Sequence, residues 1–308
     1  MKPAITINNI VKFYGAKSNK TEALSGISFN VNEGELFGII GPDGAGKTSL
    51  FRILTTLLLA DEGEATVDGY DVVKYYKEIR KRAGYMPGRF SLYQDLTVEE
   101  NLEFFATIFN TTIEKNYHLI KDIYIQIEPF KKRKAGKLSG GMKQKLALCC
   151  ALIHKPSVLF LDEPTTGVDA VSRKEFWEML KKLKQQNITI LVSTPYMDEA
   201  GMCDRVALLQ SGKILSIDTP DGIIEQFQKD LFAVRSSKML PLLNDLKICS
   251  EVEDAYFFGA YHHVVMKHKN EEQQLKNYLS KYAGDGLEIN AIRPNIEDCF
   301  MALMKNTE

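Results

Sequence analysis

The chain has 308 residues, about two domains' worth of sequence at roughly 150 residues per domain. Hydrophobic residues make up 44% and charged residues 26%. These fractions are close to those of soluble globular proteins, and they exclude a disordered, collagen-like or disulfide-scaffold chain. Lys and Arg number 39 against 40 Asp and Glu, so no overall basic field indicates a nucleic acid or an anionic membrane as partner.

The chain also lacks the usual sequence marks of membrane insertion and secretion. The longest uncharged runs, such as residues 187–197 and 255–266, fall short of the roughly 20 apolar residues that a spanning helix needs. Residues 1–10 do not have the basic and apolar regions of a signal peptide. The five cysteines are odd in number and form no CxxC pair, which predicts reduced, buried thiols in a cytosolic protein.

The first elements in chain order are strands. Alternation in residues 5–10 and an extended run at 26–31 predict two strands, the second followed by a turn at 32–34. An apolar strand at 35–40 then leads directly into a glycine-rich loop, which is followed by a helical pattern at 49–59. The order is strand, glycine loop, helix.

A helical segment is predicted from residue 92 to about 134. Thr97 and Glu100 form a capping box before a helix at 101–109, and a second helix is predicted at 113–127. The basic run at 131–134 is interpreted as a solvated face rather than an anion site.

Strands and helices then alternate, which indicates a parallel α/β sheet. The predicted elements are a loop and helix at 138–153, a buried strand at 157–161, a helix at 172–186 and strands at 188–193 and 204–209.

The pattern changes at residues 219–222, where we predict a domain boundary between residues 1–220 and residues 221–308. The second part reads as a ferredoxin-like βαββαβ arrangement followed by a last helix. Its predicted elements are a strand at 231–235, a helix at 238–248, strands at 252–258 and 261–268, a helix at 271–282, a strand at 287–292 and the last helix at 295–304.

The glycine loop fits the pattern G-x-x-x-x-G-K-[ST] in the required strand and helix context. Backbone N–H groups of such a loop surround phosphate oxygens, and the helix that follows adds its positive dipole end. Lys47 would reach the β and γ phosphates, Thr48 would bind Mg²⁺ and Ser49 would contact the α phosphate. The whole candidate loop comprises Gly41, Pro42, Asp43, Gly44, Ala45, Gly46, Lys47 and Thr48.

Two further groups of residues suit phosphate chemistry. Asp162 and Glu163 end an apolar strand, at the edge of a parallel sheet where ligands bind; Asp162 would hold Mg²⁺ and Glu163 would orient the attacking water. Ser139, Gly140 and Gly141 begin a helix and form a second phosphate cradle. Because the glycine loop already holds phosphates, this second cradle is expected to face a nucleotide on another chain.

Together these motifs resemble the ATP-binding subunit of an ABC (ATP-binding cassette) transporter, over about residues 4–220. The glycine loop matches the Walker A motif, residues 158–163 match Walker B, and residues 138–144 match the LSGGQ-like signature with Met142 in the Gln position. Residues 167–169 match the D-loop, which includes Asp169, and Tyr14 resembles the aromatic residue that stacks on adenine. The alternative for Tyr14 is a core aromatic at a strand end.

The resemblance implies an ABC-type P-loop α/β domain with a parallel-sheet core, an antiparallel N-terminal β subdomain and a helical subdomain at about 90–137, plus a small α+β ferredoxin-like accessory or regulatory domain at 221–308. Two such chains would meet head to tail around ATP and Mg²⁺ and drive integral membrane permease subunits, which are separate chains. Residues 292–300 resemble the ending of ABC-2-type exporter subunits. The expected location is cytoplasmic, peripherally on the cytoplasmic face of the membrane.

The resemblance further implies that the permease docks near residues 90–109. Aromatic residues there that could line the docking groove are Phe90, Tyr93, Phe104, Phe105 and Phe109.

Two positions depart from the family pattern. Gly88 stands where the Q-loop glutamine is expected, and Pro195 stands at the position of the switch histidine. Proline has neither a side-chain donor nor an N–H, so we expect this site to bind ATP and Mg²⁺ but to hydrolyse ATP slowly. Its intact signature would then complete the site of a different partner, which favours a heterodimer over a homodimer. Alternatively, water or a shifted side chain fills the gap.

Two other functional classes remain open. A soluble ABC-type ATPase could act on ribosomes or nucleic acid, but such proteins usually fuse two cassettes or carry coiled-coil insertions, and the near-zero charge argues against nucleic acid as a partner. A regulatory subunit that binds ATP without hydrolysing it would share most of the same sites. Finding the chain in membranes with a hydrophobic partner would indicate a transporter subunit, whereas finding it only on ribosomes would indicate the soluble ATPase.

Overall fold

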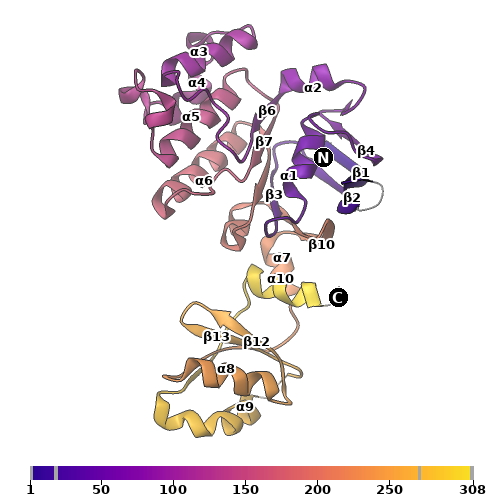
Figure 1. The fold of residues 1–308 in the computed structure, drawn as a ribbon, viewed down its shortest axis with the longest axis vertical. Coiled ribbons are helices and arrows are strands. Elements are labelled where there is room, and N and C mark those ends of the chain that lie inside the picture. Colours follow the sequence, from indigo (N-terminus) through magenta and orange to yellow (C-terminus); the bar gives the residue numbers. More distant parts are fainter. Residues whose placement is uncertain (1–2, 17–19, 270–271, 306–308) are drawn as a thin grey trace. The chain divides into compact units, whose positions relative to one another are not determined.

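The computed structural model describes residues 3–16, 20–269 and 272–305. The chain forms two compact units, Met1–Pro220 and Asp221–Glu308 (Figure 1). In the described residues, no helix is both long enough and apolar enough to cross a bilayer. All five cysteines lie in that described part, and each is buried as a free thiol.

The first unit is built on a six-stranded sheet with the order β10-β9-β3-β8-β7-β6. All neighbouring strands are parallel except β10, which is antiparallel to β9. Every residue of β3 and β7 is buried, as expected of parallel strands covered on both faces. The strands are β3 (Leu36–Ile40), β6 (Ala83–Met86), β7 (Val158–Asp162), β8 (Thr189–Thr194), β9 (Arg205–Gln210) and β10 (Lys213–Asp218).

A second, antiparallel sheet contains the N-terminal strands in the order β2-β1-β4-β5. Its apolar face packs with α1 (Lys47–Leu54) and the parallel sheet to form one hydrophobic core. Ile5, Phe51 and Phe160 are fully buried in this core. The strands are β1 (Pro3–Tyr14), β2 (Thr21–Asn32), β4 (Glu62–Val67) and β5 (Tyr70–Asp71). The parallel core and the antiparallel N-terminal sheet confirm the predicted fold class.

Helices form the remaining layer of this unit. In helix α3 the predicted capping box is present: Thr97 Oγ1 accepts from the Glu100 amide at 3.2 Å, and Glu100 accepts from the Thr97 amide at 2.7 Å. Helix α5 packs against both α3 and α4. The helices are α2 (Tyr76–Arg82), α3 (Val98–Ile108), α4 (Ile113–Tyr124), α5 (Gly140–Leu152) and α6 (Ala170–Gln185), with short 3₁₀ helices at Glu128–Phe130, Ala135–Lys137 and Met197–Met202.

The basic run at 131–134 lies on the surface of this helical layer. Lys131 and Lys132 pair with Glu99 at 3.5 and 2.7 Å, and Arg133 lies over the Phe130 ring. These partners fit a solvated charged face, as the sequence indicates.

The second unit has a four-stranded antiparallel sheet in the order β12-β13-β11-β14. This order, with α8 (Met239–Ile248) and α9 (Glu272–Tyr278) connecting the strands, confirms the ferredoxin-like arrangement. Residue 271, the predicted start of the second helix, lies outside the described residues. The other elements are α7 (Pro220–Glu225), β11 (Leu231–Arg235), β12 (Val252–Phe258), β13 (Tyr261–Met266), a 3₁₀ helix at Leu279–Asp285, β14 (Glu288–Ala291) and α10 (Ile296–Lys305).

Helix α10 is attached to this sheet through one buried carboxylate. Asp298 is fully buried, and its Oδ1 lies 2.7 Å from the Tyr256 hydroxyl and 2.6 Å from His263 Nδ1. Its Oδ2 accepts from the Asn295 amide at 2.8 Å. Burial and the hydrogen bond to Asp298 raise the pKa of Tyr256. The neighbouring His262 faces away, toward the Met239 carbonyl at 2.9 Å, as strand alternation requires.

We expect Asp298→Ala to destabilise the second unit by about 3 kcal/mol, because it leaves the half-buried Tyr256 hydroxyl and the buried His263 ring without their acceptor. Urea unfolding, followed by hydrogen exchange of the β13 amides, measures this loss. Asp298→Asn keeps the size of the side chain and one acceptor oxygen, so its loss should be smaller. Unchanged exchange in both variants would show that Asp298 does not hold α10.

Candidate functional site

The glycine loop between β3 and α1 has a shape that only glycine permits at two positions. A Cβ at Gly41 would lie 2.1 Å from the Leu209 carbonyl oxygen, and one at Gly46 would lie 2.4 Å from that of Ala23. Gly46 also has φ of 107° and is the N-cap of α1, where it has no side chain to cap the first-turn amides. The loop therefore presents backbone N–H groups at a helix N-terminus, the arrangement that suits a phosphate.

A cavity of about 150 Å³ opens at this loop. Its lining combines backbone of the glycine loop, the first turn of α1 and the carboxylate side chain that follows β7. The lining residues are Ala23, Gly44, Gly46, Lys47, Thr48, Ser49 and Glu163.

Lys47 is the cation of this cavity and is only 3% exposed. Its Nζ donates to the carbonyl oxygens of Gly41 at 2.8 Å and Pro42 at 3.0 Å. It also lies 3.1 Å from Glu163 Oε1. The predicted phosphate-binding lysine and the predicted catalytic carboxylate are therefore in direct contact.

Asp162 and Glu163 are positioned by the neighbouring strand β8. The Ser193 hydroxyl donates to Asp162 Oδ1 at 2.6 Å and accepts from the Glu163 amide at 3.0 Å. Glu163 has φ of 50°, a left-handed conformation that costs a non-glycine residue about 1–3 kcal/mol. Hydrogen bonds to Ser193 hold this strained backbone, and such strain gathers at functional sites.

The two positions that depart from the family pattern both border this site. A Cβ at Gly88 would lie 3.0 Å from the Asp162 carbonyl oxygen and 3.7 Å from Glu163 Cβ. Pro195 follows Thr194, whose carbonyl accepts from the Gly41 amide at 3.3 Å. Neither residue has a side-chain hydrogen-bond donor.

Tyr14 lies beside the first turn of α1. Its hydroxyl is 3.1 Å from Ser49 Oγ, and Lys12 Nζ lies 5.9 Å from the centre of its ring. The side chain is 40% exposed, so it is not the core aromatic of the alternative interpretation. An exposed ring next to a phosphate loop is available for stacking.

The signature residues form a separate group, in which Ser139 and Gly140 are exposed and Gly141 is half-buried. Ser139 is the N-cap of α5 and accepts from the Met142 amide at 3.4 Å. A Cβ at Gly140 would lie 3.3 Å from the Gly167 carbonyl, and one at Gly141 would lie 2.8 Å from Ser172 Oγ. The signature therefore packs on the D-loop and α6, and it contributes nothing to the described lining of the 150 Å³ cavity.

Asp169, in the D-loop, is the N-cap of α6. Its Oδ1 accepts from the amides of Val171 at 3.1 Å and Ser172 at 3.0 Å. The hydrogen bond from the Ser172 amide lowers the pKa of this carboxyl. Asp169 is exposed and also lies outside the described lining of the loop cavity.

One buried network near the site was missed in the sequence. The Glu199 carboxylate is 3% exposed and accepts from Thr165 Oγ1 at 3.1 Å, from Arg173 Nε at 3.0 Å and from the Thr194 hydroxyl. It joins the loop after β7 and α6 to the end of β8. The signal in the sequence that could have pointed to Glu199 is an acidic residue that follows an apolar strand and a turn at a proline.

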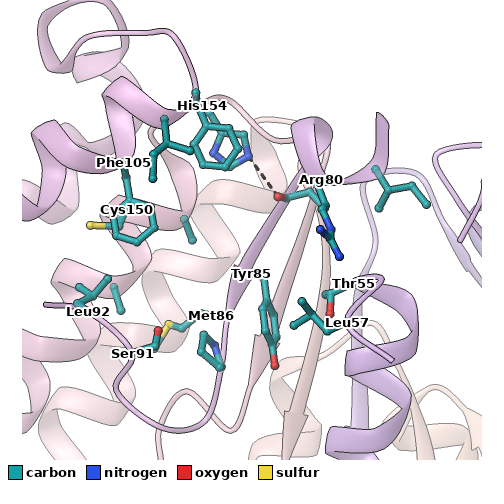
Figure 2. Close-up of a pocket in the computed structure, with 17 residues that line it drawn as sticks. Thr55, Leu57, Arg80, Tyr85, Met86, Ser91, Leu92, Phe105, Cys150 and His154 are labelled. Atoms are coloured by element: carbon teal, nitrogen blue, oxygen red, sulfur yellow. Dashed lines mark hydrogen bonds between the residues drawn. The ribbon is translucent and has the colours of Figure 1, made fainter. Parts of the chain in front are cut away.

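A larger cavity, about 420 Å³, lies between the core and the helical layer (Figure 2). Leu57, Tyr85 and Ile108 line it, together with Phe105 and Phe109. Of the predicted groove aromatics, Phe90, Tyr93 and Phe104 lie outside its described lining: Tyr93 packs against Phe104, and Lys143 lies over Phe90.

His154 closes one side of this cavity. Its ring stacks on Phe109 with centroids 3.8 Å apart, and Nε2 lies 3.2 Å from the Ala83 carbonyl oxygen. Burial lowers the pKa of His154 to about 4, so the imidazole is neutral at pH 7. The cavity is thus mainly apolar.

The sequence and the fold both match known proteins. A family model described as "ABC transporter" matches residues 24–166. Among solved structures, the dimeric ATP-binding cassette MJ0796 in a post-hydrolysis state bound to ADP and Pi has a TM-score of 0.64 and 26% identity, covering 70% of this chain and 98% of that one. The fold and the site define an ATP-binding cassette.

Curated relatives place the chain within that class. It is 36% identical over 308 residues to the probable multidrug ABC transporter ATP-binding protein YbhF of Escherichia coli, covering 97% of this chain and 52% of the relative. The chain thus spans about half the length of the first relatives that it matches. It is 30% identical to the linearmycin resistance ATP-binding protein LnrL of Bacillus subtilis, covering 97% of each. The chain belongs to the ATP-binding proteins of ABC transporters.

Proposed function

We propose that this chain is the ATP-binding subunit of an ABC exporter and binds ATP with Mg²⁺ at the glycine loop. The observation that carries the proposal is the cavity in which Lys47, the first turn of α1 and Glu163 meet. The loop residues Gly41 to Gly46 would surround the phosphates with backbone N–H groups. Lys47 would contact the β and γ phosphates, and Ser49 would contact the α phosphate.

Mg²⁺ fits the oxygen donors at this site. A hydroxyl and a carboxylate, from Thr48 and Asp162, are ligands that Mg²⁺ accepts beside substrate phosphates. When bound, the ion would neutralise charge on the β and γ phosphates. Among the chain's own groups, Glu163 would orient the attacking water and Tyr14 would stack on the adenine.

We expect hydrolysis at this site to be slow. Gly88 and Pro195 border the phosphate loop and the carboxylates, but they offer no side-chain donor to the transferring phosphoryl group. Loss of one preorganised donor costs on the order of 100-fold to 1,000-fold in rate. Nucleotide binding should persist, because the glycine loop and Lys47 are complete.

The exposed signature supports a head-to-tail dimer. Ser139, Gly140 and Gly141 would complete the nucleotide site of a second cassette, with Asp169 at the same interface. A heterodimer is favoured over a homodimer, because a partner with a complete site would use this signature productively.

The 420 Å³ cavity is proposed to receive a helix of a separate membrane permease. Its lining is apolar, and at its edge Leu57 and Ile108 are 57% and 54% exposed. Docking there would hold the chain at the cytoplasmic face of the membrane. Residues 1–220 would form the ATP-binding domain, and residues 221–308 would form an accessory or regulatory domain.

We expect Ile108→Glu to reduce co-purification with the cognate permease by about tenfold or more, because a charge enters an apolar interface. Ile125→Glu is the matched control, since Ile125 is also 54% exposed but lies after α4 and outside the described lining of the cavity. ATP binding should stay unchanged in both variants. Equal permease capture by Ile108→Glu and the unaltered chain, or recovery of the chain on ribosomes only, would contradict the proposal.

A further inference from the structure

Residues 73–77, which we call the 73–77 segment, include the turn before α2 and the first residues of that helix (α2 is labelled in Figure 1). All five side chains are exposed. Val73, Tyr75 and Tyr76 are 55%, 54% and 40% exposed, and lysines at 74 and 77 accompany them. Apolar and aromatic side chains gathered on a surface in this way usually mark a contact site.

The segment is held in place by its own surroundings. Asp71 Oδ1 accepts from the amides of Val73 at 3.0 Å and Lys74 at 2.8 Å, which fixes a turn. Buried Val72 and Ile79 anchor the chain on either side. The turn therefore presents Val73, Lys74 and the residues that follow as a defined surface.

The charge of this surface is positive. Residues 71–82 contain five basic and two acidic side chains. Glu78 pairs with Lys81 at 2.9 Å, whereas among the described residues neither Lys74 nor Lys77 takes part in a recorded ion pair. The near-zero charge of the whole chain thus conceals a local basic surface with two unpaired lysines.

This surface adjoins the proposed permease-docking cavity. Arg80, on α2, lines the cavity and donates to Thr56 Oγ1 and to the Thr56 carbonyl, both at 2.8 Å. Thr56 precedes Leu57 and Leu59, which are 57% and 63% exposed. Apolar exposure therefore continues from the edge of the cavity to α2.

We propose that the 73–77 segment binds the anionic lipid surface of the membrane. Tyrosine side chains favour the headgroup level of a bilayer, and lysines are attracted to anionic lipid phosphates. A chain docked on a permease through the adjacent cavity would bring this segment toward the cytoplasmic leaflet. The membrane setting of this inference rests on the proposed function, whereas the binding chemistry rests on the segment itself.

Co-sedimentation of the full chain with lipid vesicles tests the proposal. We expect at least tenfold stronger binding to vesicles of phosphatidylglycerol than to phosphatidylcholine vesicles. Most of the difference should be lost in 0.5 M salt, because the Debye length shortens from about 10 Å at 0.1 M toward about 3 Å at 1 M. Lys74→Ala with Lys77→Ala should weaken binding to phosphatidylglycerol about 30-fold. Tyr75→Ser with Tyr76→Ser should also weaken it, because the interfacial rings are lost.

A matched charge control lies on α6. Lys174 and Lys182 are both exposed there, and replacing both by Ala removes the same charge from another part of the first unit. This pair should change vesicle binding less than twofold. An equal loss in this control, or equal binding of the unaltered chain to both lipids, would overturn the proposal. The proposal would also be overturned if the paired variants of the 73–77 segment lost permease capture but kept vesicle binding. The segment would then be a contact site for protein.

Nucleotide binding, measured on the same samples, separates this inference from the proposed function. Both paired variants of the segment should bind ATP as the unaltered chain does, which also shows that they are folded. Vesicle binding without any ATP binding would refute the proposed function and leave the lipid surface standing. ATP binding without lipid preference would refute the lipid surface alone.

Discussion

A chain carrying both Pro195→His and Gly88→Gln is expected to hydrolyse ATP about 100-fold to 1,000-fold faster than the unaltered chain. The reason is positional. Pro195 directly follows Thr194, whose carbonyl accepts from the first amide of the glycine loop, so a histidine side chain there starts beside the loop that is proposed to hold the phosphates. Gly88 approaches the backbone of Asp162, so a glutamine there starts beside the two carboxylates that are proposed to hold the metal and orient the water.

The two substitutions should not contribute equally. At Gly88 the new Cβ would lie 3.0 Å from the Asp162 carbonyl oxygen, so the loop must shift by a few tenths of an ångström to accept any side chain. Pro195 is half-buried in a turn after β8, where a histidine also regains a backbone N–H. We therefore expect Pro195→His alone to supply most of the increase.

Steady-state phosphate release at saturating ATP measures this gain separately from nucleotide affinity. Glu163→Gln is the control in both backgrounds. It should abolish the gain of the double variant and change the slow rate of the unaltered chain little. Rapid turnover of the unaltered chain that depends on Glu163 would refute the slow-site hypothesis, and Gly88 and Pro195 would then have functional substitutes.

Lys47→Ala is expected to lower the affinity for ATP by about 100-fold. Charge-assisted hydrogen bonds contribute about 1.5–3 kcal/mol each, and 1.4 kcal/mol is a factor of ten in affinity. Lys47 is 3% exposed and is already directed by two loop carbonyls and by Glu163. Its cation is therefore fixed where the phosphates are proposed to bind.

Fluorescence titration with a labelled ATP analogue measures this loss. Lys47→Met keeps the length and apolar volume of the side chain without its charge, so an equal loss in this variant assigns the effect to the cation. A thermal melt shows whether both variants remain folded. Undiminished affinity in folded Lys47→Met would place the nucleotide away from the glycine loop.

Local patterns account for the parts of the fold and site that the sequence predicts. About ten consecutive residues are enough to specify each of three features: the glycine loop, the capping box at Thr97 and the buried strand before Asp162. Even there, the helix after the loop ends at Leu54 rather than near residue 59, because Thr56 adopts φ of 65°. A single left-handed residue stops a helix without changing its apolar pattern.

Pairings between distant segments account for the parts that were missed. Half of the residues of strand β4 are polar and its first three are exposed, and the strand forms because β1 supplies its hydrogen-bonding partner. Ser193 on β8 meets Asp162 on the neighbouring strand β7, 31 residues away in the sequence, and Arg173 meets Glu199 across 26 residues. Nothing in the neighbourhood of Ser193 or Glu199 along the chain indicates these partners, because only the folded chain brings them together.

The buried carboxylate of Glu199 has a consequence for communication across the molecule. Thr165 and Arg173, which it binds, stand on either side of residues 167–169, and Thr194, which it also binds, immediately precedes Pro195. Because the interior is closely packed and resists deformation, these segments must move together. If the turn at position 195 moves, the exposed D-loop at residues 167–169 would therefore move with it. One nucleotide site of the proposed dimer could then influence the other without a direct contact between the two sites.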